Sequence, residues 1–257
     1  MFNEIQNNLV HFYNFLSKSK HTTIRIDDNI TYYALGFSSP FLNIALCDLK
    51  KIKDIDTAIQ DIKNFFKNIK TNKFTFVSCD YQYDKHVKDK LLENGFTYDE
   101  GSIGMAYDLN SFTDNEQSDI KVTHVASKLK LIDWAQTSMS GYGLAYSYSE
   151  TCYDIFEDKI ADTNNIFLLA TVNNEPAATG LLMLQGDIAG IYWIATKPEF
   201  RKKELATALT LEMLHRAKDA GCKHAVLQST TMALNLYKRL GFKEYFRMSG
   251  FLFEFLH

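Results

Sequence analysis

The chain has 257 residues, of which 46% are hydrophobic and 14% aromatic, so it can bury a core larger than one average domain needs. Lys plus Arg number 28 against 31 Asp plus Glu, and the formal net charge is -3. Such a charge gives no strong attraction to nucleic acid or to an anionic membrane, and we expect neither as a partner.

The cysteines and the N-terminal segment bear on the compartment. Four cysteines stand singly, without CxxC spacing, at Cys47, Cys79, Cys152 and Cys222. This pattern argues against a metal site or a disulfide framework and fits a reducing compartment. Glu4 lies where a signal peptide needs positive charge, and no apolar run approaches the roughly 18 residues of a membrane span. We therefore expect a cytoplasmic protein.

The first half of the sequence alternates strand and helix patterns. Strands are predicted at 30–37 and 41–49, a helix at 54–69, a strand at 73–80, a helix at 85–92 that ends before Asn94-Gly95, and a strand at 102–109. This order is typical of an α/β or α+β fold.

A polar segment, SFTDNEQSD at 111–119, separates this half from the next. It offers few apolar side chains to a core and several residue types that favour turns. We place a domain boundary there, between an N-terminal α/β domain at 1–112 and a second domain at 118–257.

The second half begins with helices and continues with a strand pair. Helices are predicted at 126–139 and 150–160, joined by the aromatic loop GYGLAYSYS at 141–149. A hairpin follows at 166–172 and 177–184 with its turn at 173–176, then a strand at 189–196, a helix at 203–220, a strand at 223–229, a helix at 232–240 and a strand at 245–255.

A faint internal repeat relates the two halves. Residues 90–109 and 236–255 share a helix end, a Gly-Phe pair, a polar gap and a closing strand. Either the halves are related, or two helix-Gly-strand joints look alike by chance.

Two segments of the second half carry a family resemblance. Residues 191–209 read IYWIATKPEFRKKELATAL, and residues 233–242 read ALNLYKRLGF. Their order of strand, Pro-Glu-aromatic-Arg turn, basic loop, helix, strand and Leu-Tyr helix resembles the GNAT N-acetyltransferase superfamily. The resemblance implies a mixed, mostly antiparallel sheet flanked by helices, with a smaller N-terminal α/β domain that is itself a degenerate GNAT-like repeat if the halves are related.

The same resemblance implies acetyl-CoA as co-substrate and an amine of a small molecule or protein as acceptor. In the family, a loop of pattern R-x-x-G-x-G/A at a helix start binds the diphosphate through backbone N–H groups. The positions that match that loop are Arg201, Lys202, Lys203, Glu204, Leu205 and Ala206. Residues 202–207, which include Thr207, are the predicted contact with the diphosphate. Homodimers are frequent in the family, so a homodimer is also implied.

Two further features of the resemblance concern the strand and one substitution. Ile194, Ala195 and Thr196 occupy the strand that in the family splays from its neighbour and pairs with the pantetheine arm. Glu204 stands where the family has glycine, and a carboxylate near a diphosphate costs ~1 kcal/mol when solvated. We expect weakened, not abolished, cofactor binding.

Tyr237 is the residue singled out for catalysis, because it matches the family tyrosine that protonates the departing thiolate. The aligned residue of the first half is Leu91, so that half would serve as scaffold or substrate wall. No general base stands out; the acceptor-side candidates are Glu150, Tyr142, Tyr146, Tyr148, Tyr192 and Trp193.

Glu204 and the two-part architecture also fit a different class of protein, a non-catalytic module that senses acyl-CoA or binds a partner protein. A third reading, an acetylating toxin acting on charged tRNA, predicts a basic surface that the net charge does not supply.

Overall fold

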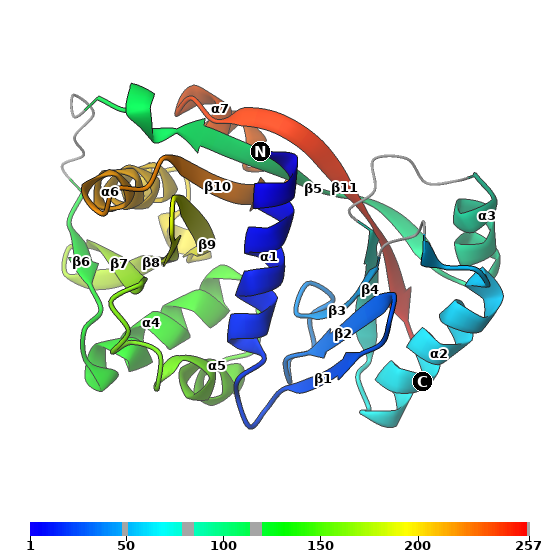
Figure 1. Cartoon of the computed structure of the whole chain (residues 1–257). Helices are drawn as coiled ribbons and strands as arrows, with labels where there is room; N and C mark the ends of the chain where they lie inside the picture. Colours follow the sequence, from blue (N-terminus) through cyan, green and yellow to red (C-terminus); the bar gives the residue numbers. More distant parts are fainter. Residues whose placement is uncertain (48–50, 79–84, 114–119, 256–257) are drawn as a thin grey trace. The chain divides into compact units, whose positions relative to one another are not determined.

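A computed structural model describes residues 1–47, 51–78, 85–113 and 120–255 of the chain (Figure 1). These form two compact units, each built from two stretches of sequence. The C-terminal unit comprises Met1–Phe12 and Gly104–Tyr245, and the N-terminal unit comprises Tyr13–Ile103 and Phe246–His257.

The C-terminal unit contains a sheet whose strand order is β5-β10-β9-β8-β7-β6. Its strands are β6 (Val122–His124), β7 (Asn165–Val172), β8 (Glu175–Gln185), β9 (Ile188–Thr196), β10 (His224–Ser229) and the end of β5 (Thr97–Asp108). β6 to β9 pair antiparallel in succession, whereas β9 and β10 are parallel. The sheet is mixed and mostly antiparallel, as the sequence predicted.

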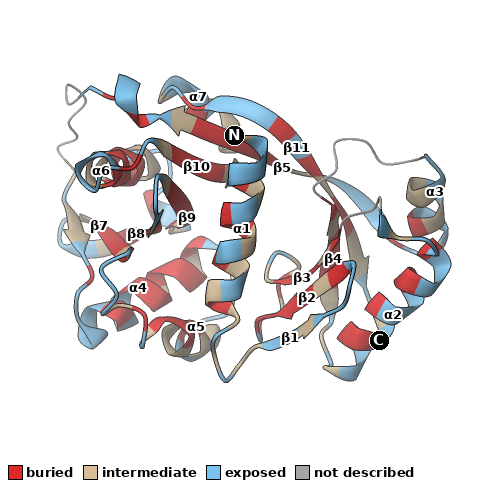
Figure 2. Ribbon diagram, in the orientation of Figure 1, coloured by how far each residue is buried: buried red, intermediate tan, exposed pale blue. Residues whose placement is uncertain are grey.

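In the C-terminal unit, α4 (Lys128–Gly141) and α6 (Leu205–Asp219) pack on β8 and β9. The unit also contains α5 (Tyr148–Phe156), which packs on α4, together with α7 (Leu234–Arg239) and the first residues of α1 (Phe2–Leu16). Buried residues recur along both α4 and α6, and Figure 2 colours them red. Burial of those apolar faces, more than helix propensity, holds helices of this length in place.

The N-terminal unit has the strand order β1-β2-β3-β4-β11-β5. Its own elements are β1 (Thr23–Ile26), β2 (Ile30–Ala34), β3 (Asn43–Cys47), α2 (Ile55–Asn68), β4 (Lys73–Ser78) and α3 (Lys85–Glu93), and β11 (Lys243–Glu254) joins them from the end of the chain. Asp54 caps α2 by accepting hydrogen bonds from the amides of Asp56 and Thr57. α2 begins there because two of its first amides gain an acceptor.

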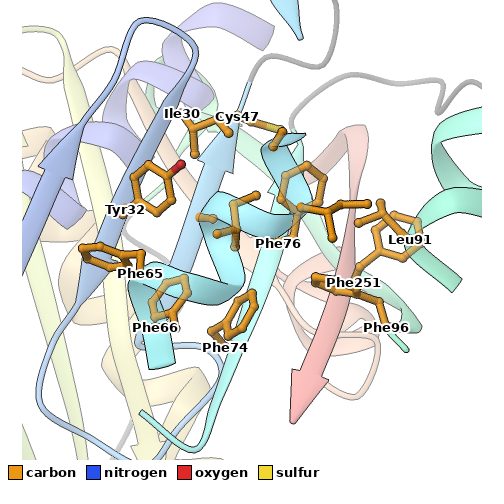
Figure 3. Close-up of a cluster of buried hydrophobic side chains, with 14 of the residues drawn as sticks. Ile30, Tyr32, Cys47, Phe65, Phe66, Phe74, Phe76, Leu91, Phe96 and Phe251 are labelled. Carbon is orange, nitrogen blue, oxygen red and sulfur yellow. The ribbon is translucent and has the colours of Figure 1, made fainter. Parts of the chain in front are cut away.

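An aromatic core fills the N-terminal unit (Figure 3). Phe74 of β4 is fully buried and stacks on Phe66 of α2 with ring centroids 4.2 Å apart. Phe96 and Phe253 pack around the same ring. Leu91 of α3 is fully buried in this cluster, so its side chain serves the packing of the core.

The two halves of the chain repeat one order of elements. Each half has three strands that pair antiparallel in succession, then a helix, a strand parallel to the third, a second helix and a last strand. This order runs from β1 to β5 and again from β7 to β11. The helix ends also match: Phe96 donates its amide to the Leu91 carbonyl, and Phe242 donates to the Tyr237 carbonyl. The halves are therefore structurally related, and Leu91 corresponds to Tyr237.

The last strand of each half is exchanged. β11, from the second half, pairs antiparallel with β4 of the first, from Ser249 with Ser78 to Glu254 with Lys73. β5, from the first half, lies beside β10. The strand beside each parallel pair therefore comes from the other half of the sequence: β11 lies beside β4, and β5 lies beside β10.

Several elements depart from the sequence prediction. α1, β1 and β6 were not predicted, and β5 begins at Thr97, earlier than the expected 102. Asn173 and Asn174 alone make the hairpin turn, both with positive φ, and Pro176 lies within β8. The expected boundary at 111–119 lies largely outside the described residues. The units do not follow the ranges 1–112 and 118–257, which remain a prediction about independently folding domains.

A truncation tests that division. Residues 118–257 alone lack Met1–Phe12 and Gly104–Asp108, which belong to the C-terminal unit, and leave the β10 edge without β5. We expect this fragment to lose cooperative unfolding in a circular-dichroism melt, because an uncovered strand edge and core are exposed. Fragments 1–112 and 113–257 expressed together should copurify as a folded complex. A monomeric 118–257 fragment with a cooperative melt would contradict the strand exchange.

Candidate active site

β9 and β10 diverge within the C-terminal unit. Their parallel ladder pairs His224 with Ile188, Ala225 with Ala189 and Val226 with Gly190, and then ends. Both strands continue beyond it, as Ile191–Thr196 and Leu227–Ser229; we call these two segments the fork. Backbone groups that face the fork are not used by a ladder and are available to an extended ligand.

A β-bulge in β9 accompanies the divergence. The β8–β9 register shifts between Thr179, opposite Ala195, and Leu181, opposite Tyr192. Trp193, inside the bulge, has φ +55, a left-handed conformation that is rare for a bulky residue. Bulges re-aim side chains and end pairing next to functional sites.

Buried hydroxyls hold the bulge in place. Ser138 of α4 donates to Thr179 Oγ1 at 3.1 Å, and Thr179 donates to the Trp193 carbonyl at 3.3 Å. Both side chains are fully buried. Because a buried carbonyl without a partner is costly, this relay stabilises the irregular strand.

The predicted cofactor strand lies in the fork. Ile194, Ala195 and Thr196 form the end of β9, and Ala195 and Thr196 are still held by β8 on the other side. The C-terminal end of α4 presses on them: a Cβ at Gly141 would lie 2.8 Å from Ala195 Cβ and 2.9 Å from the Thr196 nitrogen. The position of this strand end therefore depends on a residue without a side chain.

The predicted diphosphate loop leads from β9 into α6. Lys202 and Glu204 both have positive φ, at +61 and +55, and Glu204 is the N-cap of α6. The amides of Leu205, Ala206 and Thr207 make the first turn, where helical N–H groups have no partner within the helix. An anion is favoured at such a helix start.

Glu204 occupies the conformation that suits the glycine of the family pattern. Its carboxylate accepts a hydrogen bond from Thr207 Oγ1 at 2.7 Å and lies 3.7 Å from the Arg239 guanidinium. Left-handed backbone costs a non-glycine residue about 1–2 kcal/mol. The position thus places both strain and a negative charge at the α6 N-terminus.

The remaining loop residues differ in their roles. Arg201 donates to the Gly141 carbonyl at 3.1 Å and to the Thr196 carbonyl at 3.4 Å, so it ties the α4 end to β9. Lys203 lies over the Phe200 ring at 5.2 Å, and Lys202 and Lys203 are exposed. Their contact with a diphosphate stays a prediction.

Tyr237 lies on α7, next to the start of α6. A hollow of about 310 Å³ separates the two helices and is lined by Glu204, Thr207, Leu236, Arg239 and Leu240. Tyr237 is buried, packs edge-on against Phe242 at 5.6 Å, and burial raises its pKa. The phenol therefore keeps its proton well above neutral pH, as a proton donor requires.

The acceptor-side candidates differ in their exposure. Tyr142 and Tyr146 are exposed on the loop after α4, Glu150 is exposed on α5, and Tyr148, the first residue of α5, is half-buried. Tyr192 and Trp193 are buried on β9. No group of His, Cys, Asp and Glu side chains in the described ranges could hold a metal ion.

Sequence reasoning missed the contribution of α1. Asn8 and Phe12 pack on Tyr192, with Phe12 stacked on its ring at 3.9 Å. Apolar residues at 2, 5, 9, 12 and 16 give a helical pattern that could have located α1. Nothing in that pattern indicates that α1 packs on β9.

The equivalent parallel ladder of the N-terminal unit shows no divergence within its described residues. It runs from Ile44 with Thr75 to Cys47 with Ser78, the last described residues of both strands. Leu91 stands in place of Tyr237. The tyrosine that the resemblance implies as proton donor is therefore found at this position in the C-terminal unit and not in the N-terminal unit.

Comparisons with known proteins agree with this geometry. Residues 129–242 match the model of the acetyltransferase (GNAT) family. A GCN5-related N-acetyltransferase from Kribbella flavida superposes with a TM-score of 0.67 at 14% identity, covering 100% of this chain and 96% of that one. Another from Sphaerobacter thermophilus gives 0.64 at 13% identity, covering 90% and 82%.

A tandem GNAT protein from the clavulanic acid biosynthesis pathway is also similar, with a TM-score of 0.56 at 11% identity, covering 92% of this chain and 84% of that one. At such identities the likeness concerns the fold. It confirms the GNAT-like fold and its tandem arrangement.

Gly141 provides a test of the strand end. Gly141→Ala should lower the free energy of unfolding by about 1–3 kcal/mol in urea, because the new Cβ would meet β9 backbone. Hydrogen exchange of the Thr196 amide should accelerate. At Gly143 a Cβ meets nothing within 4 Å, although the φ of +67 strains any side chain. Gly143→Ala should therefore also lower stability but leave the exchange of the Thr196 amide by local opening unchanged. Equal exchange in both variants would show that Gly141 does not position β9.

Proposed function

We propose, from the membership of residues 129–242 in the GNAT acetyltransferase family, that this protein is an acetyl-CoA-dependent N-acetyltransferase acting on an amine of a small molecule or protein. The observation that carries the proposal is the fork: a strand whose ladder ends at Gly190 and Val226 and which then runs to the start of α6. Acyltransferase activity is the general expectation for this family, and an amine as the acceptor is the more specific part of the proposal.

The fork would bind the co-substrate through main-chain groups. Ile194, Ala195 and Thr196 would pair with the pantetheine amides as a further strand. The first-turn amides of α6 would bind the diphosphate. An N–H in the fork would polarise the thioester carbonyl and stabilise the oxyanion that forms when the amine attacks.

Direct transfer then needs two proton movements. The amine nitrogen bonds to the carbonyl carbon, the carbon–sulfur bond breaks, and Tyr237 donates its proton to the departing sulfur. The ammonium proton leaves to water, which needs no dedicated base, and water then returns a proton to the Tyr237 phenolate so that the cycle closes. Burial raises the pKa of Tyr237, which keeps the phenol protonated before the transfer.

A cytoplasmic location fits the same proposal. Cys152 and Cys222 are free, buried thiols, as a reducing compartment would leave them. None of the described helices combines the length and apolar composition needed to cross a bilayer.

Glu204 favours one competing function, an acyl-CoA sensor without catalysis. Its carboxylate lies at the helix start that would bind the diphosphate, held by Thr207 and near Arg239. Calorimetry with acetyl-CoA, followed by thiol release with an amine library, separates the two. Binding without thiol release from any amine would favour the sensor.

Glu204→Gly should tighten acetyl-CoA binding by about three- to tenfold in calorimetry. The change removes a charge worth ~1 kcal/mol near the diphosphate and relieves left-handed strain. Glu204→Gln removes the charge alone, and its gain should shrink at high salt. Glu199→Gln, an exposed carboxylate outside the α6 first turn, is the control and should change little. Weaker binding by Glu204→Gly would mean that the carboxylate assists the loop.

Tyr237→Phe should lower kcat by about 10²–10⁴-fold while leaving the Kd for acetyl-CoA within twofold. The phenyl ring keeps the contact with Phe242 but cannot donate a proton. Tyr245→Phe, at a half-exposed tyrosine of the same unit, is the matched control. Retention of full kcat by Tyr237→Phe would remove this residue from the mechanism.

A further inference from the structure

β1 forms an open edge of the N-terminal unit. It pairs with β2 on one side, from Thr23 with Ala34 to Ile26 with Thr31, and no other strand of the described residues lies on its other side (Figure 1). An open strand edge presents unpaired N–H and C=O groups to any strand that can reach it. The register with β2 determines which residues of β1 carry these groups.

Ile24 and Ile26 direct their backbone groups toward the open edge. Asp27 donates its amide to the Ile30 carbonyl at 2.9 Å, so these two residues form a hydrogen-bonded pair at the end of the β1–β2 ladder. Such pairs alternate along an antiparallel ladder. Arg25 therefore points its N–H and C=O groups toward β2, whereas Ile24 and Ile26 point theirs away from β2.

The same two residues carry exposed apolar side chains. Ile26 is 71% exposed and Ile24 is 39% exposed, and Figure 2 colours most of β1 pale blue. Because they stand two residues apart in a strand, their side chains lie on one face of the sheet. Charged side chains or prolines usually protect an open edge. Isoleucines at both outward positions instead mark a surface that favours a partner strand.

Arg25 lies on the opposite face and is neutralised within its own chain. Its guanidinium donates to the Asp27 carboxylate at 2.6 Å and to the Tyr32 hydroxyl at 2.8 Å, and it lies 4.1 Å from the centroid of the Tyr32 ring. Tyr32 belongs to β2. The charge is therefore held over β2, away from the open edge, and does not oppose the approach of a second copy.

We infer that β1 is a dimer interface, in which it pairs antiparallel with β1 of a second copy about a two-fold axis at Arg25. The inference does not depend on the proposed function. In this register Ile24 of each copy lies opposite Ile26 of the other, so that the outward N–H and C=O groups of both residues gain partners. The isoleucines of both copies then pack against each other on one face.

The partner is a second copy because β1 is complementary to itself in this register alone. Moving the axis by one residue would pair Ile26 with its own copy and bring Ile24 opposite Asp28, which lies outside β1. A two-fold pairing also uses the β1 edge of both copies and therefore stops at two.

The oligomeric state of the full-length protein tests the inference. Sedimentation equilibrium from about 1 to 500 µM should show a monomer–dimer equilibrium with a micromolar Kd, because one strand pair buries less than the roughly 800 Å² per partner of a stable interface. A protein that stays monomeric at the highest concentration would overturn the inference. Assembly beyond the dimer would overturn it as well, since the pairing is closed.

A proline tests the backbone pairing. Ile24→Pro removes an outward N–H and keeps the bonds between β1 and β2, because proline is tolerated at edge positions whose N–H faces solvent. The Kd of the dimer should rise at least tenfold, while the melting temperature stays within a few degrees of the wild type. Leu129→Lys, at an exposed leucine of α4, is the control and should change neither. Dimerisation of Ile24→Pro at the wild-type Kd would contradict the pairing.

A charge pair tests the register. Ile26→Lys alone should raise the Kd at least tenfold, because each introduced lysine would face an isoleucine of the other copy. Adding Ile24→Glu to the same chain sets a carboxylate opposite each introduced lysine, so the Kd should return to within about threefold of the wild type at low salt and rise with salt. If Ile26 faced its own copy instead, the introduced lysines would repel each other. A double variant that stays monomeric would overturn the inference.

Discussion

The end of the β9–β10 ladder at Gly190 and Val226 is the constraint on which the C-terminal unit depends. Two parallel strands normally remain paired until one of them stops. Here both continue without pairing to each other, while β9 stays paired with β8. Three sets of contacts hold β9 in place: the Ser138–Thr179 relay on the Trp193 carbonyl, Arg201 on the carbonyls of Gly141 and Thr196, and the close approach of Gly141 to Ala195. The cost of an open ladder is offset by many small interactions on the outer side of β9.

The two halves show what the same order of elements does without those interactions. β3 and β4 stay paired to the last described residue, and phenylalanines fill the space around them. Leu91 contributes to that core at the position where Tyr237 stands in the other half. In the described residues, the first half therefore has a packed core at this position, and the second half has two strands that separate. Both halves nevertheless follow the same order of helices and strands.

Much of the fold could be predicted from local patterns. The helix at 205–219, the strands on either side and the Gly241-Phe242 junction were expected within a few residues, since caps, glycines and apolar spacing are local signals. The strand exchange could not be predicted, because β4 and β11 are far apart in sequence and no local pattern selects a partner. α1 was missed for a related reason: its apolar spacing is visible, yet its packing on Tyr192 depends on Gly190, where a Cβ would overlap the Asn8 amide, and on the bulge.

The candidate site shows the same limit. The loop from Arg201 to Thr207 and Tyr237 were identified from their order along the chain, and the left-handed Glu204 agrees with the glycine expected there. Asn8 and Phe12 have no sequence signature, because their roles arise from tertiary contacts. A bulge is a property of the folded chain.

The exchanged last strands have a consequence for biosynthesis. β4 emerges from the ribosome long before β11, yet β11 is its sheet neighbour. The N-terminal unit therefore cannot complete its sheet until residues 243–254 have been synthesised, and the edge of β4, with Phe74 and Phe76, stays uncovered by β11 until then. Domains usually fold in the order of their synthesis; here the earlier half needs a strand of the later half, so the nascent chain depends on whatever shields that edge in the meantime.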